Sequence, residues 1–565
     1  MTLGDEPATA SSDQSLIDAA RAWRDQDPDE RTGLELDELI RDAVAGSESA
    51  TANLASRFAT RLEFGTAGLR GELGAGPNRM NRVLVGQAAA GFAAYLLARE
   101  NEPSVVIGYD GRTNSSVFAM DTAELMSGAG VRTILLPRAL PTPVLAFAVR
   151  HFSLSAGVMV TASHNPAADN GYKVYLGGVD NGSQIVPPAD AEIAAEIDRV
   201  ARERRVSELA RSSNFEIADE SVVDEYVRRT AALAGHPPSR VRFVYTALHG
   251  VGWETAKRVF AAAGFDEPIV VAEQIEPDAA FPTVVFPNPE EPGAMDLAFA
   301  RGSQTAAELI IANDPDADRL AIAVPDSAGG WRRLSGNEVG AILGWRAAER
   351  LARSGEVGVL AASIVSSPAL REIARQYGLE YVDTLTGFKW VSRVDGIAFG
   401  FEEALGYLVD PDKVRDKDGI SAAVDFLALV SELKATGLSI DDHALDFAER
   451  FGAFASSQIS LRVDDVGEIA RMMTALRRDQ PSRIGSFGVE RIDDFVGGFD
   501  AFPPGDILRI WLENGARVVV RPSGTEPKLK IYIDASSTAG DAGERIATAQ
   551  AIVDELDTAM RALVR

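Results

Sequence analysis

Short apolar runs alternate along most of the chain with segments in which apolar residues recur three and four positions apart. The first pattern is typical of buried strands and the second of helices, so the sequence predicts α/β domains with mixed or parallel sheets. Most of the apolar runs end in a polar loop that contains glycine, and open α/β sheets bind ligands at such ends. We expect strands over residues 104–110, 132–138, 156–163, 241–250, 308–314, 356–363 and 397–403.

Helical spacing marks both ends of the chain. Residues 16–25 and 34–44 space their apolar side chains as helices do, so we expect the segment before residue 60 to be helical. Further helices are expected over residues 88–97 and 339–351. A closing helix is expected to pack one apolar face against the core, and that face carries Ile546, Ala549, Val553, Leu556, Met560 and Leu563.

The chain of 565 residues is too long for one hydrophobic core, and typical domain sizes predict three or four domains. The pattern of elements breaks near Pro237, near Leu334 and over residues 451–456. No repeat of fixed period occurs in the sequence. We therefore expect domains over residues 1–236, which include a helical extension, and over 237–334, 335–455 and 456–565, the last of a different character.

The net charge of −27 argues against a nucleic-acid partner, which requires a broad basic face. Cysteine is absent, which excludes disulfides, thiolate metal sites and cysteine nucleophiles. The longest apolar stretch, residues 85–98, is too short to span a bilayer, and no secretory or mitochondrial signal is recognisable. We expect a cytoplasmic enzyme without a membrane partner. An anionic substrate would require cations concentrated at the site of this acidic protein.

In the segment AGVMVTASHNPAADNGYKVY, residues 156–175, the buried part of the predicted strand ends at Val160, and the hydroxyl of Ser163 follows in a loop of Asn, Pro, Asp and Gly. Its surroundings are not the GxSxG elbow of hydrolases, so an acyl-enzyme nucleophile of that class is not indicated. One interpretation is a turn in which Ser163 bonds to the local backbone. The other is a reactive hydroxyl. Lys173 is either a surface lysine or a cation that holds phosphate or moves a proton.

The segment ELIIANDPDADRLAIAV, residues 308–324, carries Asp314, Asp316 and Asp318 between two apolar runs. In an extended backbone, alternate positions project to one side, so we expect the three carboxylates to face together. Clustered carboxylates repel one another and favour a cation, and oxygen ligands without His or Cys indicate Mg²⁺. The EF-hand pattern fails, because its glycine and glutamate positions hold Arg319 and Pro325. A solvated acidic turn is the alternative.

The segment RVVVRPSGTEPKLKIY, residues 517–532, has the composition of an anion-binding loop. Arg521 offers a planar fork to phosphate oxygens, while Ser523 and Thr525 add hydroxyls. Gly524 allows backbone N–H groups to approach an anion closely. A plain β-turn is the alternative interpretation. Lys528 keeps the neighbourhood cationic.

Weaker motifs occur at residues 65–71, 386–390, 400–407 and 416–420. Glu402 and Glu403 either bind sugar hydroxyls or are ordinary acids at a helix start. The five histidines form no metal-binding pattern, and His164 and His249 lie in motif-like loops. Cations expected at strand ends or in glycine-bearing loops satisfy the charge requirement stated above, and they are Arg70, Lys173, Arg319, Lys389, Lys417 and Arg521.

Together these motifs resemble the α-D-phosphohexomutase family, which includes phosphoglucomutases and phosphomannomutases. TASHNP, DPDADR, GFEEALGY and RPSGTEP occur in the family's order, and with GTAGLRG they extend over residues 65–532. The sequences EFGTAGLRG and GFEEALGY are most similar to those of the branch that contains bacterial phosphoglucomutases and animal phosphopentomutase-like enzymes. The resemblance implies four domains around a central cleft: three similar α/β domains and a distinct C-terminal α+β domain.

The resemblance also implies roles for individual residues. Ser163 would be phosphorylated in the active enzyme, and an oxygen of its phosphate would join the three aspartates around Mg²⁺. Lys173, Lys417 and Arg70 match positions that handle protons or phosphoryl charge, and Glu402 matches a contact to a sugar hydroxyl. The other substrate-binding positions are His164, Arg319, Thr386 and Lys389, together with Arg521, Ser523, Gly524 and Thr525, which would grip the non-reacting phosphate.

The implied activity is that of a phosphosugar mutase that interconverts hexose 1-phosphate and hexose 6-phosphate, with glucose preferred and mannose as a second substrate. Glucose 1,6-bisphosphate would be activator and intermediate, and closure of the last domain would exclude water. The protein would be a monomer or homodimer. Many relatives have serine two residues after Glu402, where this chain has Ala404, which weakens the assignment to a hexose.

Three alternatives follow. A phosphopentomutase would act on ribose or deoxyribose 1-phosphate. A phosphatase could use the same metal site, although a hydrolase needs no grip on a second phosphate. A non-catalytic sugar-bisphosphate sensor would not require the serine and the aspartates, all of which are present.

Overall fold

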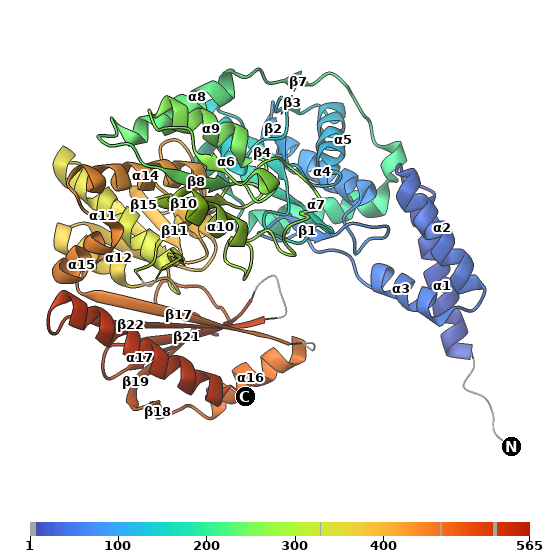
Figure 1. The fold of residues 1–565 in the computed structure, drawn as a ribbon. Coiled ribbons are helices and arrows are strands. Elements are labelled where there is room, and N and C mark those ends of the chain that lie inside the picture. Colours follow the sequence, from blue (N-terminus) through green and yellow to red (C-terminus); the bar gives the residue numbers. More distant parts are fainter. Residues whose placement is uncertain (1–6, 328, 464–465, 524–527, 565) are drawn as a thin grey trace. The chain divides into compact units, whose positions relative to one another are not determined.

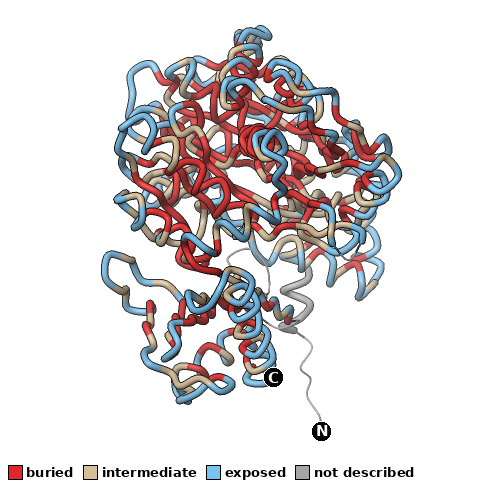
Figure 2. Tube along the Cα trace, turned by 60° about the vertical axis from the view of Figure 1, so that its left-hand side comes forward, coloured by how far each residue is buried: buried red, intermediate tan, exposed pale blue. Residues whose placement is uncertain are grey.

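Four β-sheets covered by helices make up the computed structural model, which describes residues 7–327, 329–463, 466–523 and 528–564 (Figure 1). The chain forms two compact units. Unit 1 contains the residues up to Arg333 together with Asp410–Asp425, and unit 2 contains Leu334–Val409 and the residues from Phe426 onward. Buried stretches alternate with exposed ones along the Cα trace (Figure 2).

The first sheet of unit 1 has seven strands in the order β1-β5-β4-β2-β3-β7, with β6 paired to β5. Strands β2, β3, β4 and β7 run parallel, whereas β1, β5 and β6 add antiparallel pairs at one edge. The strands are β1 (Leu69–Glu72), β2 (Ser104–Tyr109), β3 (Arg132–Leu135), β4 (Ala156–Val160), β5 (Asp169–Leu176), β6 (Ser183–Gln184) and β7 (Glu216–Ile217).

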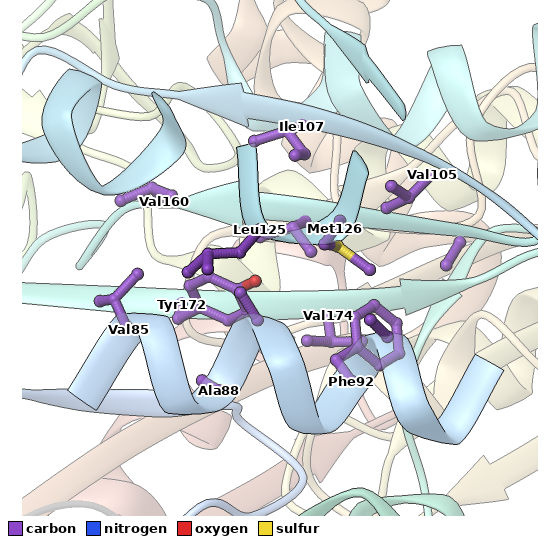
Figure 3. Packing of buried hydrophobic residues seen from close by; sticks show 14 of the residues in the cluster. Val85, Ala88, Phe92, Val105, Ile107, Leu125, Met126, Val160, Tyr172 and Val174 are labelled. Atoms are coloured by element: carbon purple, nitrogen blue, oxygen red, sulfur yellow. The ribbon is translucent and has the colours of Figure 1, made fainter. Parts of the chain in front are cut away.

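One face of this sheet carries the large apolar core shown in Figure 3. Val105 and Ile107 of β2 pack there against Phe92 and Leu125, because alternate residues of a strand point to the same face. The helices of this domain are α4 (Arg82–Leu97), α5 (Ser115–Gly128), α6 (Thr142–His151) and α7 (Ala189–Glu203). Helix α4 is buried along most of its length, so it shows no polar face.

The second sheet of unit 1 has the strand order β12-β11-β10-β8-β9. Strand β10 pairs parallel with β8 and antiparallel with β11, so a tight chain reversal connects β10 to β11. The strands are β8 (Phe243–Thr246), β9 (Ile269–Val270), β10 (Leu309–Asn313), β11 (Leu320–Pro325) and β12 (Trp331–Arg333). The accompanying helices are α8 (Ser221–Ala231), α9 (Gly252–Ala262) and α10 (Asp296–Thr305).

The predicted helical extension is confirmed as α1 (Pro7–Arg24), α2 (Glu30–Val44) and α3 (Glu48–Phe58). Its own apolar cluster includes Ala75, Val83 and Val206 of the first domain, which attaches the extension to that domain. The carboxylate of Glu35 accepts a hydrogen bond from the backbone N–H of Ala75 (3.1 Å).

The third sheet, in unit 2, has the order β14-β13-β15-β16 with parallel pairing around β13. Its strands are β13 (Val359–Ser363), β14 (Glu380–Thr384), β15 (Ile397–Glu402) and β16 (Gly406–Leu408). Its helices are α11 (Gly336–Ser354), α12 (Ala369–Tyr377), α13 (Phe388–Val391), α14 (Gly419–Ala435), whose first turns belong to unit 1, and α15 (Ile440–Phe451).

The fourth sheet is antiparallel throughout, in the order β17-β22-β21-β20-β19-β18. It comprises β17 (Ala453–Arg462), β18 (Arg483–Ile484), β19 (Phe487–Asp494), β20 (Leu508–Leu512), β21 (Arg517–Pro522) and β22 (Lys528–Ser537), with helices α16 (Val466–Arg478) and α17 (Ala542–Leu563). Three mixed or parallel α/β sheets and one antiparallel sheet confirm the expected fold class and the different character of the last domain. All seven strands expected from the sequence are present.

The expected apolar face of α17 is correct only in its centre. Ala549, Val553, Leu556 and Met560 are buried, but Ile546 and Leu563 are 40% and 44% exposed. A stripe with a seven-residue period drifts by roughly 20° per heptad around a straight helix. Its two ends therefore turn away from the sheet.

None of the described helices combines the length and the hydropathy that a membrane span requires.

A half-buried histidine couples the stability of unit 2 to pH. The ring of His443 stacks on Trp345 with 4.5 Å between centroids, and burial lowers its pKa from 6.5 to about 4. The unfolded chain therefore binds the proton first as pH falls, so this stabilisation is complete above pH 6.5 and is lost between pH 6.5 and 4.

We predict that the free energy of unfolding of the wild type falls between pH 7 and pH 5 by about 2 kcal/mol more than that of His443→Phe, which retains a ring for the stack but cannot bind a proton. Denaturant unfolding at the two pH values measures the difference. Equal losses in both proteins would show that His443 does not titrate in this way.

Candidate active site

Ser163 lies immediately after β4 in a left-handed backbone conformation, with φ of 55°. Its side chain is buried, and its Oγ donates a hydrogen bond to Asp314 Oδ2 (3.0 Å) and lies 3.1 Å from His164 Nδ1. The backbone N–H of Ser163 donates to Thr161 Oγ1 (2.8 Å). The hydroxyl thus faces the loop that carries Asp314, Asp316 and Asp318, which we call the acidic loop. The interpretation of Ser163 as a hydroxyl bonded to the local backbone is therefore wrong.

Asp314, Asp316 and Asp318 occupy the chain reversal between β10 and β11, and all three are buried. Each offers one carboxylate oxygen within 4.8 Å of the others. The extended backbone expected from the sequence is not found here. Ala317 has φ of 53°, and its N–H donates a hydrogen bond to the carbonyl of Asp314 (2.8 Å), which closes a turn. The antiparallel pairing of Asn313 with Leu320 requires this turn, and the turn brings the carboxylates together.

The acidic loop fits a metal ion. Asp316 Oδ1 and Asp318 Oδ1 are buried and have no hydrogen-bond partner among the described residues, which is costly for carboxylate oxygens. Burial, together with the charges of Asp316 and Asp318, raises the pKa of Asp314 well above its ordinary value. A divalent cation would bind the two oxygens that lack partners and would offset the repulsion among the carboxylates. Three carboxylates suit a hard ion.

Lys173 lies within β5 and reaches the acidic loop from the first domain. Its Nζ donates to Asp316 Oδ2 (2.8 Å) and to Asp318 Oδ2 (3.2 Å). Burial opposes the charge of Lys173, but the two carboxylates raise its pKa above the ordinary value. Burial likewise opposes ionisation of Asp316, yet Lys173 and the hydroxyl of Thr142 hold its pKa below the ordinary value.

Lys417 belongs to Asp410–Asp425, a segment of unit 1 that lies in the sequence between two parts of unit 2. Its Nζ lies 3.3 Å from Asp318 Oδ2. The hydroxyl of Tyr175 donates to Asp416 (2.9 Å) and the hydroxyl of Tyr226 to Asp418 (2.8 Å), which fix the segment to β5 and α8. Gly419 is required because a Cβ there would lie 2.2 Å from the carbonyl oxygen of Arg319.

Arg70 and Arg319 complete the cationic surroundings of Ser163. Arg70 donates to Asn165 Oδ1 (3.2 Å), and the backbone N–H of Arg319 donates to Asp314 Oδ1 (2.9 Å). Burial and the two arginine charges lower the pKa of His164 well below its ordinary value, so the imidazole is neutral at pH 7. Unit 1 therefore assembles Ser163, His164, Arg70, Lys173, Asp314, Asp316, Asp318, Arg319 and Lys417 around one loop.

The remaining predicted residues belong to unit 2. Glu402 ends β15, and its Oε1 accepts a hydrogen bond from the N–H of Gly387 (2.6 Å), next to Thr386 and two residues before Lys389. Arg521 of β21 lies opposite Lys530 of β22 in the register of these two antiparallel strands. Ser523 N donates to the carbonyl of Lys528 (2.7 Å). Gly524 and Thr525 lie outside the described residues.

Several cations do not lie in loops, contrary to expectation. Lys173 is inside β5, because Tyr172 and Val174 beside it are buried in the apolar core and the alternation turns Lys173 to the opposite face. Arg70 and Arg521 are likewise strand residues, and Lys389 lies in the short helix α13.

Sequence analysis missed Asp110, Arg112 and Thr142. Thr142 Oγ1 donates to Asp316 Oδ2 (2.7 Å) from the start of α6. Arg112 donates hydrogen bonds to the backbone of the Ser163 loop. The signal was available for two of them, since the segment GYDGR ends a predicted strand in a polar, glycine-bearing loop.

The chain matches four family descriptions in order: "Phosphoglucomutase/phosphomannomutase, alpha/beta/alpha domain I" over residues 61–204, the corresponding domain II over 224–329, domain III over 335–451, and the C-terminal domain over 462–550. A probable phosphomannomutase from Haemophilus influenzae is 55% identical over 486 residues, which cover 86% of this chain and 98% of the relative. The chain belongs to the phosphoglucomutase/phosphomannomutase family. It is therefore a member of a family of phosphomutase enzymes, and the resemblance noted in the sequence is confirmed.

Relatives with other names match this phosphomutase over similar lengths. A mouse phosphopentomutase is 35% identical and covers 89% of the chain and 88% of its own length. A phosphoglucomutase from Staphylococcus haemolyticus is 34% identical, with 84% and 90% covered. The fold is similar to that of parafusin, a Paramecium phosphoglucomutase, with a TM-score of 0.68 at 18% identity and 89% and 96% covered.

We predict that Asp318→Asn lowers the affinity of the protein for Mn²⁺, a probe for hard oxygen sites, by at least about 100-fold, because it removes one charge and one ligand. Titration followed by electron paramagnetic resonance measures free Mn²⁺. Asp296→Asn, a change at an exposed acid of the same unit, is the control and should bind as the wild type does. Equal affinity of both variants would mean that the acidic loop is not the metal site.

Proposed function

We propose that this phosphomutase interconverts hexose 1-phosphate and hexose 6-phosphate, with glucose or mannose as the sugar, through a phosphorylated Ser163 and a sugar bisphosphate. The observation that supports this best is the buried Ser163 hydroxyl, 3.0 Å from a carboxylate oxygen of the acidic loop. A hydroxyl at that position can carry a phosphoryl group whose oxygens lie beside the cations of unit 1.

The acidic loop would hold the metal through Asp314, Asp316 and Asp318. Bound Mg²⁺ would offset the negative charge of the transferring phosphoryl group. Arg70, Lys173, Arg319 and Lys417 would contribute fixed positive charge for the same purpose, since phosphoryl transfer depends chiefly on position and charge.

In the first half-reaction the bond between Ser163 Oγ and phosphorus breaks, and a bond forms between phosphorus and the free hydroxyl of the hexose phosphate. The hydroxyl loses its proton and Ser163 Oγ takes one up as it leaves phosphorus, so this half-reaction releases no net proton. Lys173 and Lys417 would stabilise the two oxygens with their fixed positive charges during this exchange. The second half-reaction returns the other phosphoryl group of the bisphosphate to Ser163. Glucose 1,6-bisphosphate would therefore act as intermediate and as activator of unphosphorylated protein.

The substrate-binding residues expected from the sequence also include side chains of unit 2. Glu402, ordered by the N–H of Gly387, is suited to accept hydrogen bonds from sugar hydroxyls. Thr386 and Lys389 flank Gly387, and His164 of unit 1 completes the substrate-binding set. The non-reacting phosphate would be gripped by Arg521, Ser523, Gly524 and Thr525, a function that a phosphatase would not need.

We also propose domain limits after residues 236, 334 and 455. The support is that β7 (Glu216–Ile217) still belongs to the first sheet and β8 (Phe243–Thr246) to the second. The antiparallel fourth sheet begins with β17 (Ala453–Arg462), so the third limit falls within the first residues of that strand.

The alternative is a phosphopentomutase, and Ala404 favours it because a serine hydroxyl for the sugar is missing at this position. The same residue offers a direct test. We predict that Ala404→Ser raises kcat/KM for glucose 1-phosphate relative to ribose 1-phosphate by about 5- to 10-fold, as one added hydrogen bond of about 1 kcal/mol would. If ribose 1-phosphate is the better substrate of the wild type by orders of magnitude, the pentose assignment replaces the hexose assignment.

The mechanism is tested with two serine variants that share a backbone conformation. With Mg²⁺ and a trace of glucose 1,6-bisphosphate, we predict that Ser163→Ala lowers the rate of conversion of glucose 1-phosphate or mannose 1-phosphate by at least about 1,000-fold. Ser153, which also has a positive φ of 52° but lies at the exposed end of α6, is the matched control, and Ser153→Ala should retain activity. Undiminished activity of Ser163→Ala would exclude the phosphoserine mechanism.

A further inference from the structure

One buried guanidinium holds the backbone of the Ser163 loop. Arg112 Nη2 donates to the carbonyl oxygens of Ser163 and Asn165, each at 2.6 Å. Arg112 Nη1 donates to the carbonyl oxygens of Pro166 (2.8 Å) and Asp169 (3.1 Å). A single side chain thus bonds four carbonyl groups within seven residues of the loop.

Arg112 is itself fixed from the other side. Its Nε lies 3.4 Å from Asp110 Oδ2, and both side chains are almost fully buried. Asp110 also accepts hydrogen bonds from Ser115 Oγ (2.6 Å), Thr161 Oγ1 (2.7 Å) and the N–H of Arg112 (3.0 Å). Burial of an ion pair is costly unless its other hydrogen bonds are made, and here Asp110 makes three of them.

The same network reaches the N–H of Ser163. Thr161 Oγ1 donates to Asp110 and accepts from Ser163 N (2.8 Å), so Asp110 and Arg112 act on the two sides of one peptide segment. The guanidinium also lies over the ring of Phe281 in the second domain, 4.9 Å from its centroid. Its position is therefore determined by residues of both domains of unit 1.

The loop needs such support, because Ser163 has φ of 55° and is not glycine. A left-handed conformation costs an ordinary residue roughly 1–2 kcal/mol, and it persists only where surrounding interactions impose it. This conformation directs Oγ toward Asp314, which is where a phosphoryl group on the serine would meet the acidic loop.

We propose that Arg112 is a positioning residue for phosphoryl transfer. With Asp110 and Thr161 it holds Ser163 in the left-handed conformation that aims the hydroxyl at the metal-binding loop. Arg112 contacts the Ser163 loop through backbone carbonyl groups and would not contact the sugar. This inference rests on the proposed role of Ser163. Lysine cannot replace the residue, because a single ammonium group cannot reproduce the planar fork that reaches four carbonyl oxygens.

The test compares Arg112→Lys with Arg82→Lys. Arg82 is a matched control, because its guanidinium also bonds a buried acid of the same domain, Asp121, through two hydrogen bonds of 2.7 and 2.8 Å. It lies on α4 and belongs to no part of the proposed site. Each variant is measured for kcat, KM, melting temperature, Ser163 phosphorylation by glucose 1,6-bisphosphate and amide hydrogen exchange of residues 161–170.

For Arg112→Lys we expect kcat to fall about 100-fold, as misplacement of a reacting group by about 1 Å can cause, with KM changed less than about 3-fold. Exchange at residues 161–170 should become faster, and 50 mM guanidinium should partly restore kcat to Arg112→Ala. Arg82→Lys should melt at a similarly lowered temperature with kcat within about 2-fold of wild type and unchanged exchange at these residues. The proposal is overturned if both variants lose kcat equally, or if exchange at residues 161–170 is unchanged in Arg112→Lys.

If Arg112→Lys does not fold, Thr161→Val takes its place, because it removes the link between Asp110 and the N–H of Ser163 while keeping the shape. It should lower kcat about 10-fold with KM nearly constant and accelerate the same exchange, and wild-type values in both would contradict the proposal. If the proposed function is wrong, Ser163 of the wild type will not become phosphorylated. The hydrogen-exchange comparison would still decide whether Arg112 orders the loop.

Discussion

Repulsion among three buried carboxylates is the constraint on which unit 1 depends. Asp314, Asp316 and Asp318 each place an oxygen within 4.8 Å of the others, in surroundings that exclude water. Such a cluster is stable only where cations surround it. Lys173 comes from the first sheet, Lys417 from a segment encoded about a hundred residues later, and a metal ion would supply the remaining charge. The strongly acidic chain therefore gathers its positive groups where the phosphomutase needs them.

Two left-handed residues that are not glycine set the geometry of the site. Ala317 turns the chain between β10 and β11, and Ser163 turns it after β4. Antiparallel strand pairing imposes the first turn, whereas side-chain hydrogen bonds to backbone impose the second. Strain of this kind is stable only within an already rigid frame. The large apolar core beneath the first sheet and the paired strands of the second provide that frame (Figure 3).

Local patterns in the sequence were sufficient to predict seven strands of the first three sheets, the fold class, and the serine and aspartate motifs, because each of these depends on residues within about ten positions of one another. The turn at Ala317 was not predicted, because alternate spacing places side chains on one side only if the backbone is extended. The location of Lys173 inside a strand was missed for a related reason: a charged residue between two buried tyrosine and valine side chains is evident only once the opposite face is known to line a site. The segment GYDGR could have drawn attention to Arg112, but its role could not have been assigned, because its partners are carbonyl oxygens some fifty residues away and carbonyl groups have no sequence signature.

The path of the chain gives the placement of Asp410–Asp425 a consequence for biosynthesis. The polypeptide leaves unit 1 after Arg333, forms all four strands of the third sheet, returns to unit 1 for Asp410–Asp425 and leaves again within α14. A ribosome that has released only the first two domains has therefore released an acidic loop without Lys417. Completion of unit 1 must wait for the third sheet to emerge, so the nascent chain cannot finish its N-terminal half before it has begun the C-terminal one. A chain terminated before this segment would lack Lys417, so the carboxylates of the acidic loop would have one fewer counter-charge. The charge compensation of the site therefore depends on synthesis of the chain beyond Lys417.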